Sequence, residues 1–177
     1  MAGGHEHIVV KIAEATSLTD GEVEDLARIL IAVIEGGASV GWARPPSIEV
    51  AREYWRGVVK PGIVLLVATD GEQVVGTAQL ELAQRENGRH RAEVAKVLVD
   101  PARKGAGIGR QLLDAVEAVA RREGRTLLHL DTTEGDPANQ FYQRCGWTPI
   151  GTIPNWARFG PDDKLFGTTF YYKVLTA

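Results

Sequence analysis

The stretch Leu-Val-Asp-Pro-Ala-Arg-Lys-Gly-Ala-Gly-Ile-Gly-Arg, residues 98–110, decides the fold of this chain. An apolar strand ends at Val99, a glycine-rich turn follows, and a helix then runs to about Arg122 with apolar residues at helical spacing. Glycines let the backbone approach a ligand closely, and the first amides of a helix have no partner within it. These amides, the helix dipole and the cations Lys104 and Arg110 suit a pyrophosphate.

Other interpretations of this turn are open. A phosphate loop of the Gly-x-x-x-x-Gly-Lys-Ser/Thr type needs a spacing that is absent here. A dinucleotide-binding loop is favoured by Asp131, which ends the next strand about 20 residues on, where a ribose-binding acid belongs. Arg110 in place of the third glycine disfavours it, as do the five residues from Asp100 to Lys104 between the strand and the first glycine. A plain flexible turn is the structural alternative.

The rest of the chain shows helix and strand patterns around this turn. Helices are expected from the Thr19–Glu22 capping box to Gly36-Gly37, over Ser47–Val59, from Ile108 to about Arg122, and from Asp136-Pro137 to Gly146. Strands are expected at residues 7–13, 63–69, 74–82, 91–99, 126–131, 147–153 and 168–175. Val50, Tyr54 and Val58 share a stripe of the second helix. The order predicts one mixed, mostly antiparallel α/β sheet with helices on both faces, in which strand 126–131 runs parallel to strand 91–99.

Length and composition narrow the class of protein. The chain has 177 residues, 20 basic and 23 acidic, with a net charge of −3, which argues against a nucleic-acid surface. We expect one domain over residues 1–177, with residues 1–6 disordered. The apolar runs are too short to span a membrane, and no signal peptide is evident. A single cysteine, Cys145, excludes a disulfide framework, so we expect a cytoplasmic protein.

Two motifs in order carry a resemblance to a known family. Residues 98–101 with 104–109 resemble the central motif of the GNAT superfamily of N-acetyltransferases, and residues 141–147, Phe-Tyr-Gln-Arg-Cys-Gly-Trp, match its Phe-Tyr-x-x-x-Gly-aromatic signature. The resemblance implies a GNAT-like fold and acetyl-CoA as cosubstrate. Lys104 stands where the family usually has arginine or glutamine, and Gly135 where it often has asparagine. The implied cofactor-binding residues are Val97, Leu98, Val99, Lys104, Gly105, Ala106, Gly107, Ile108, Gly109 and Arg110.

Further segments resemble the tabtoxin resistance proteins of that superfamily, which acetylate an amino group of a small β-lactam toxin. The matching segments are residues 36–41, 91–94, 109–112, 127–132 and 168–175. Because several of them lie outside the cofactor motifs, the resemblance implies a small amine as acceptor.

Acetyl transfer to an amine requires removal of a proton from the amine and donation of one to the departing thiolate. The resemblance implies that Glu93 and Asp131 bind and deprotonate the amine, with Glu93 as our candidate base. Tyr142 is the candidate acid for the thiolate, and an amide of Val97 or Val99 would polarise the thioester carbonyl. The three side chains also have plain structural interpretations: Glu93 as a surface acid, Asp131 as a turn acid and Tyr142 as a packed core residue.

Substrate contacts are expected from residues 35–44 and from a loop over residues 154–167. Ser39, Trp42 and Trp156 are the candidate substrate-binding residues. The charged residues Arg44, Arg158, Asp162 and Asp163 would pair with a zwitterionic ligand. Two further chemistries are disfavoured. Cys145 lies on an apolar stripe, so a packed thiol is favoured over an acetyl-cysteine intermediate, and His129 with Asp131 lacks a third ligand for a metal.

The sequence therefore predicts an enzyme that transfers acetyl directly from acetyl-CoA to a primary amine of a small, amino-acid-like or toxin or antibiotic molecule. A protein or peptide N-acetyltransferase and a non-catalytic acyl-CoA sensor are the alternatives. We expect no metal, nucleic acid or membrane partner, and a homodimer stays open.

Overall fold

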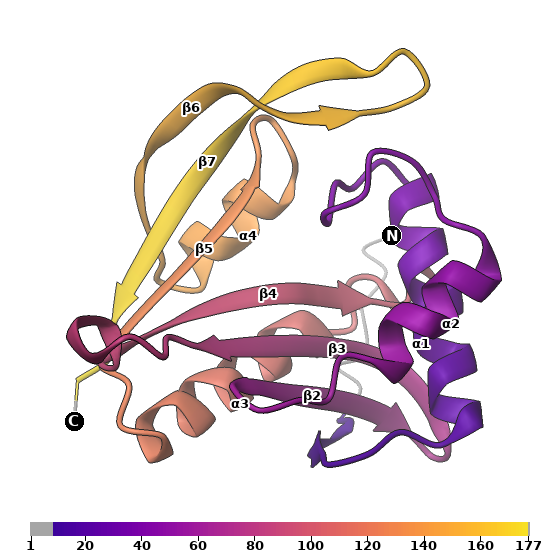
Figure 1. Cartoon of the computed structure of the whole chain (residues 1–177), viewed down its shortest axis with the longest axis horizontal. Helices are drawn as coiled ribbons and strands as arrows, with labels where there is room; N and C mark the ends of the chain where they lie inside the picture. Colours follow the sequence, from indigo (N-terminus) through magenta and orange to yellow (C-terminus); the bar gives the residue numbers. More distant parts are fainter. Residues whose placement is uncertain (1–8, 177) are drawn as a thin grey trace, which may run out of the picture.

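A computed structural model describes residues 9–176, which form one seven-stranded sheet in the order β1-β2-β3-β4-β5-β7-β6 (Figure 1). The strands are β1 (Lys11–Ala15), β2 (Ile63–Asp70), β3 (Gln73–Leu82), β4 (Arg91–Val99), β5 (Leu127–Thr133), β6 (Thr148–Phe159) and β7 (Lys164–Val174). The helices are α1 (Asp20–Glu35), α2 (Ile48–Arg56), α3 (Ile108–Arg122) and α4 (Ala138–Arg144), with 3₁₀ turns η1 (Glu86–Gly88) and η2 (Pro101–Arg103). The first strand begins later than expected. Positions 7 and 8, and the disorder expected for residues 1–6, lie outside the described residues.

The start of α1 follows from its capping box. The Glu22 amide donates to the Thr19 hydroxyl at 3.3 Å, and the Thr19 amide donates to the Glu22 carboxylate at 2.8 Å. These two bonds satisfy donors that would otherwise lack partners at a helix start. The helix ends at Gly36, as predicted.

The second helix corrects one prediction. Ser47 caps α2, and Ala51 and Trp55 are its buried residues. Of the predicted stripe, Val58 is buried just beyond the helix and Tyr54 packs against the core, but Val50 is 49% exposed. The neighbouring stripe, which carries the large Trp55 ring, faces the core instead of Val50. Spacing alone does not distinguish adjacent stripes, because both recur with the same period.

The sheet carries helices on both faces, as predicted. The apolar side chains of α1 and α2 pack against Leu65, Val67 and Leu98 on one face, and those of α3 and α4 pack on the other. Gly76 of β3 brings α3 close to the sheet, because a Cβ there would lie 3.0 Å from the Leu98 carbonyl and 3.1 Å from Leu112 Cδ1. Within residues 9–176, no helix has the length and apolar character needed to cross a membrane.

The centre of the sheet opens between β4 and β5. These parallel strands pair only over residues 91–93 and 127–129, and beyond that point they diverge (Figure 1). By contrast, β5 pairs with β7 along its whole length, from Leu127 opposite Val174 to Thr133 opposite Thr168. The divergence leaves a gap whose sides are backbone edges.

The last two strands are longer than the sequence predicted. Residues 154–167 are not a loop: β6 continues to Phe159 and β7 begins at Lys164, so most of this segment forms a hairpin. Pro154 and the left-handed Asn155 (φ +56°) sit where the β6 register shifts. An edge strand tolerates both, because one of its sides forms no ladder.

Candidate active site

A row of polar side chains crosses the sheet beside the gap. Glu81 of β3 is the register partner of Glu93 of β4, which is the partner of His129 of β5. Register partners point to the same face of a sheet, so these three side chains lie together. Asp131 follows His129 by two residues and therefore faces the same way, at the level where the strands have separated. The two candidate acids thus lie at one mouth of the gap.

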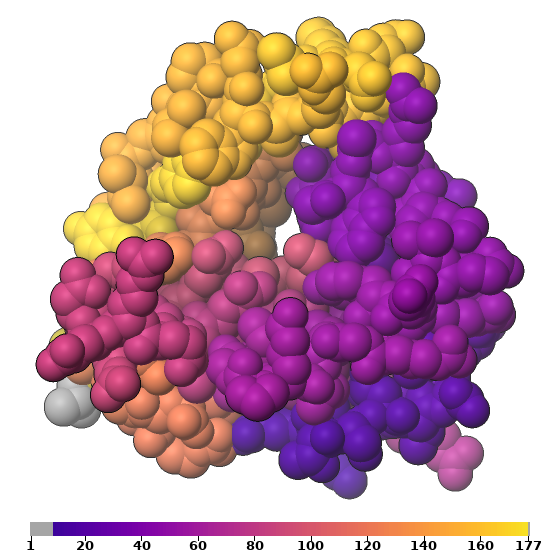
Figure 2. Space-filling model, viewed as in Figure 1, coloured from indigo at the N-terminus to yellow at the C-terminus, as the bar shows by residue number. Residues whose placement is uncertain are grey.

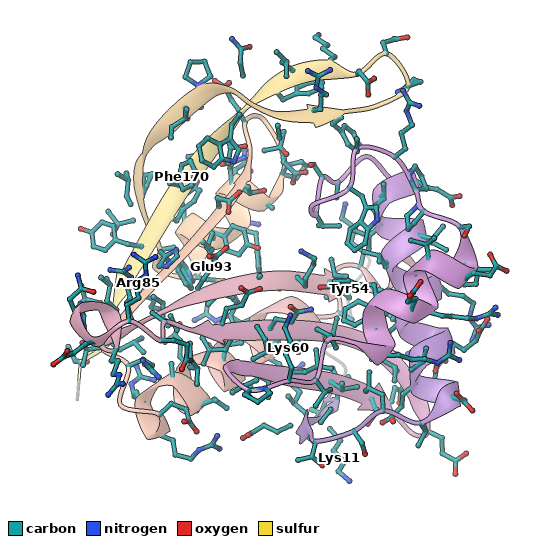
Figure 3. All side chains as sticks on the ribbon, in the orientation of Figure 1. Lys11, Tyr54, Lys60, Arg85, Glu93 and Phe170 are labelled. Carbon is teal, nitrogen blue, oxygen red and sulfur yellow. The ribbon has the colours of Figure 1, made fainter. Side chains whose placement is uncertain are left out.

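The surface is hollow at this place. Figure 2 shows a depression between the β6–β7 hairpin, the α1–α2 connection and β4. In Figure 3, Glu93 and Tyr54 lie on two sides of this hollow, and Phe170 lies above Glu93 on β7. Phe170 is the register partner of Asp131, and its ring meets that of Trp156 edge-on at 5.1 Å.

The hollow shifts the protonation of both acids. Burial raises the pKa of Glu93, and the carboxylates of Glu81 and Asp131 raise it further, while Lys96 lowers it. Asp131 is exposed to solvent, but the protein around it removes part of its hydration, which raises its pKa against the opposing effects of Lys96 and His129. The pKa of His129 is lowered, first by burial and then by Arg91. A carboxylate with a raised pKa is a stronger base than an ordinary one, which suits proton removal near neutral pH.

Sequence reasoning missed Lys96. The β3–β4 register shifts between Thr77 and Gln79, so that Lys96 and Val97 form a bulge opposite Ala78. Lys96 takes a left-handed conformation there (φ +51°), which is uncommon for a residue other than glycine. Its ammonium lies 5.8 Å from the Trp42 ring and 6.0 Å from the Tyr54 ring. The only available signal was a lysine inside an otherwise apolar half-strand.

Tyr142 lies on the opposite side of the sheet, in α4. Its ring packs against those of Phe141, Trp147 and Tyr171, and the residue is 8% exposed. Within residues 9–176, no group forms a hydrogen bond with its hydroxyl. Burial raises the pKa of the phenol, and nearby acids, Asp131 among them, raise it further. The hydroxyl is therefore a protonated donor without a partner, close to the gap.

The glycine turn has the geometry of a ligand cradle. Gly105 (φ +87°) and Gly107 (φ +81°) adopt left-handed conformations, and Gly107 is the N-cap of α3. A glycine cap provides no side chain for the first-turn amides, so they stay available to a ligand. Gly109 also needs to be small, because a Cβ there would lie 3.2 Å from the Phe141 ring.

Two cations were expected at this turn, and their surroundings differ. Lys104 is exposed beside the glycines. Arg110 lies one turn into α3, where it pairs with Asp114 at 3.4 Å and donates to the Arg144 carbonyl at 3.4 Å. Val99 lies beside the gap. The Asp100 amide bonds to Val75 of β3, so by alternation the Val99 amide points away from β3.

The hairpin tip bridges the hollow. The Gly160 amide donates to the Ala43 carbonyl at 2.9 Å, and Arg44 donates to the Pro161 carbonyl at 3.1 Å while pairing with Asp163 at 3.4 Å. Arg44 and Asp163 pair with each other in this structure, and the expectation that they pair with a ligand stays a prediction. This bridge joins the hairpin to the α1–α2 connection.

The three candidate substrate residues differ in position. Trp42 contacts Tyr54 edge-on at 4.9 Å and faces Lys96, so it lines the hollow. Trp156 is 56% exposed and lies on the β6 bulge against Phe170 rather than on a loop. Ser39 is half-buried in the α1–α2 connection.

Cys145 is a buried free thiol, with Arg110 Nη1 3.8 Å from its sulfur. The prediction that it packs in the core is confirmed by its place in the apolar cluster around Tyr142 and Trp147. Among residues 9–176, no three His, Cys, Asp or Glu side chains are arranged to hold a metal ion.

A family model described as "Acetyltransferase (GNAT) family" matches residues 25–147, which is more than half of the chain. The chain belongs to the GNAT family of acetyltransferases. An uncharacterized N-acetyltransferase from the hisH-hisA intergenic region of Azospirillum brasilense is 33% identical over 128 residues, covering 71% of this chain and 76% of that one.

Solved structures share the GNAT fold. The ribosomal-protein-alanine N-acetyltransferase of Brucella melitensis superposes with a TM-score of 0.76 at 24% identity, over 93% of this chain and 99% of that one. A Salmonella typhimurium structure with its cofactor acetyl-CoA has a TM-score of 0.75 at 20% identity, over 94% of each chain. These likenesses confirm the predicted fold, and with the family they identify an acetyl-CoA-dependent N-acetyltransferase.

The residues of this GNAT chain fit acetyl-CoA. The left-handed glycines leave the first-turn amides of α3 uncovered for a diphosphate, and the diverging edges of β4 and β5 offer backbone groups to an extended, amide-containing chain. At the position where the family often has asparagine, Gly135 (φ +79°) supplies no side chain. The backbone donors of the cradle do not depend on a side chain at this position.

Proposed function

We propose that this GNAT enzyme transfers acetyl directly to a primary amine of a small, amino-acid-like acceptor. One observation carries the proposal: two carboxylates with raised pKa values lie at one mouth of the β4–β5 gap, and a phenol without a partner lies behind it. Proton removal and proton donation are thereby assigned to opposite sides of one opening.

In this mechanism, acetyl-CoA supplies the acetyl group as a thioester when it is bound. Asp131 holds the acceptor ammonium, and Glu93 removes a proton from it, so that the neutral amine reaches the acetyl carbon. The amide of Val99 donates to the carbonyl oxygen as negative charge builds on it. Tyr142 donates its phenolic proton to the departing sulfur, which releases CoA as the thiol, and the second proton of the acetylated nitrogen restores the phenol.

The bridged hollow favours a small acceptor over a protein. A folded protein substrate would need an open groove. Here the contact of Gly160 with Ala43 and the Arg44–Asp163 pair join the β6–β7 hairpin to the α1–α2 connection and so narrow the entrance to the hollow. The resemblance of five segments to the tabtoxin resistance proteins also supports a small amine. A sensor without catalysis would need no acids at the gap, so the position of Glu93 supports an enzyme.

Thiol release from acetyl-CoA tests this function against a panel of amino acids, β-lactam amines, aminoglycosides, polyamines and peptides. We expect acceleration by at least one small amine and none by peptides. Acceleration by peptides alone would indicate the protein-modifying alternative. No acceleration by any acceptor, together with tight CoA binding, would overturn the proposal in favour of the sensor.

A further inference from the structure

The ammonium of Lys96 has no anionic partner. Lys96 is half-buried, yet within residues 9–176 its Nζ donates no hydrogen bond and has no carboxylate within 4.0 Å. The ammonium lies over the Trp42 and Tyr54 rings. An ammonium has three donors, and burial removes part of the hydration of this one while no protein acceptor replaces it, so an anion that enters the hollow would meet an unpaired positive charge.

The bulge in β4 is what directs this side chain into the hollow. Glu93 and Ala95 face the hollow, so regular alternation would direct Lys96 to the opposite face, where Val94 packs in the core beneath α3. The bulge and the left-handed conformation of Lys96 direct it instead toward α2. Strained residues of this kind are concentrated at ligand sites, where the surrounding structure holds them.

A role of Lys96 as counter-ion to the nearby acids does not explain the position of its ammonium. Glu81, Glu93 and Asp131 all raise the pKa of Lys96, while burial lowers it by a larger effect. None of the three carboxylates contacts the ammonium, which lies against Trp42 and Tyr54 instead. The hydroxyl of Tyr54 accepts a bond from Gln79 at 2.9 Å, which fixes this ring in place.

We propose that Lys96, Trp42 and Tyr54 form a subsite for a carboxylate of the acceptor. The proposal rests on the proposed function and names its substrate class: the acceptor carries an ammonium, held at Asp131 and Glu93, and a carboxylate, held by Lys96. The aromatic rings cover the acceptor's apolar part between these two groups.

The charges of the hollow support a zwitterion over a polycation. Lys96 places a positive charge where the second amine of a diamine or an aminoglycoside would lie, and like charges in a low-dielectric cleft repel. Arg44, another cation near the hollow, is engaged by Asp163 and Pro161. Glu93 and Lys96 are three residues apart on β4, about 10 Å along an extended strand. Both α-amino and longer ω-amino acids are therefore reasonable acceptors.

Matched acceptor pairs test the subsite. Thiol release is measured with the standard L-amino acids and with ω-amino acids from β-alanine to 6-aminohexanoate, each beside its carboxamide. We expect kcat/KM to be about 10- to 100-fold higher for an acid than for its amide, the value of a charge-assisted hydrogen bond. Lys96→Met should abolish that preference by raising KM for the acid alone, and Lys96→Arg should restore part of it.

Methionine is a fair replacement, because an unbranched side chain meets the same left-handed strain as lysine. Lys164→Met is the matched control: Lys164 also lies over a ring, that of Phe166 at 5.3 Å, but on the exposed hairpin. It should leave the acid preference unchanged. Thermal unfolding of each variant shows whether it folds, and acceptor binding by calorimetry gives a readout without turnover.

Failure of this proposal is distinguishable from failure of the proposed function. If amines are acetylated but the wild-type enzyme treats acids and amides alike, the subsite is refuted and the acetyltransferase stands. A pH profile that shifts equally for acid and amide in Lys96→Met would indicate the counter-ion role and would also overturn it. If no amine is accepted at all, the proposed function fails first.

Discussion

Substitution of two neighbouring tyrosines, Tyr142 and Tyr171, can distinguish a catalytic role from a packing role. The rings of Tyr142 and Tyr171 lie 6.0 Å apart in the same aromatic cluster, but their hydroxyls differ. The Tyr171 hydroxyl donates to Asn139 Oδ1 at 2.7 Å and accepts from Gln143 at 3.4 Å, whereas within residues 9–176 the Tyr142 hydroxyl has no partner. Replacing each by phenylalanine removes one oxygen from the same environment.

The two variants should have opposite effects. Tyr142→Phe removes no protein hydrogen bond, so the free energy of unfolding should stay within about 0.5 kcal/mol of wild type. Loss of a general acid should lower kcat about 10²- to 10⁴-fold, equivalent to roughly 3–5 kcal/mol of barrier. Tyr171→Phe leaves Asn139 Oδ1 without a donor, which should cost about 1–3 kcal/mol of stability, at roughly 2–4 °C of Tm per kcal/mol. Its kcat should stay near wild type.

Steady-state thiol release and thermal unfolding followed by circular dichroism measure both effects. KM for acetyl-CoA should be unchanged in Tyr142→Phe, because the cradle lies on α3 rather than on α4. A Tyr142→Phe enzyme with kcat within threefold of wild type would remove this phenol from the mechanism. Equal losses of turnover in both variants would show that the cluster matters only through packing.

Three further changes probe the acids, the cradle and the bridge. Glu93→Gln should lower kcat/KM at least 10²-fold and raise stability at neutral pH. The pKa of Glu93 is raised above its ordinary value of 4.5 in the folded protein. Between these two pKa values the folded state keeps a proton that the unfolded chain has released, so the stability of the wild type falls as pH rises. Urea unfolding from pH 4 to 8 should show this fall in the wild type and less of it in Glu93→Gln. Gly109→Ala pushes on Phe141 and should raise KM for acetyl-CoA more than it lowers kcat; an unchanged KM would contradict the cradle. Arg44→Ala removes an exposed pair, worth about 1 kcal/mol or less, and should raise the acceptor KM and speed hydrogen exchange at the hairpin tip; no change in either would show that the bridge is incidental.

Local signals in the sequence were sufficient for most of the fold. The capping box, the Asp70-Gly71 turn and the switch from strand to helix period after Val99 each depend on residues close together in the chain, so they could be read directly. The limits of the hairpin could not. Proline and glycine in residues 154–167 favour a loop, but an edge strand accommodates them at a bulge, and pairing with β7 outweighs the local preference.

The site was predictable in its motif residues and not in its geometry. Glu93, Asp131 and Tyr142 were chosen from motif positions, and the structure brings them to two sides of one gap. The pairing of Arg44 with Asp163 joins residues far apart in sequence, so no local pattern could reveal it. The direction of Lys96 depends on a single extra residue opposite Ala78, and strand alternation alone predicts the opposite face.

That extra residue also links the two halves of the site. The strand β5 satisfies one backbone edge fully through β7, so it can leave β4 after three residues without losing its place in the sheet. On the β4 side, the bulge ends regular alternation at the level where the gap opens, which turns Lys96 toward Trp42 while the amide of Val99 points away from β3. Removing one residue from the bulge would therefore do more than delete a cation. It would leave Val97 alone opposite Ala78 and make the pairing of β4 with β3 regular, while Glu93 keeps the face that it has now. A deletion of Lys96 should consequently lower turnover as well as remove the preference for acids, because β4 no longer bends at the level where the gap opens, whereas Lys96→Met should lose only the preference. Comparing kcat with a carboxamide acceptor in these two variants separates the backbone role of position 96 from the role of its side chain.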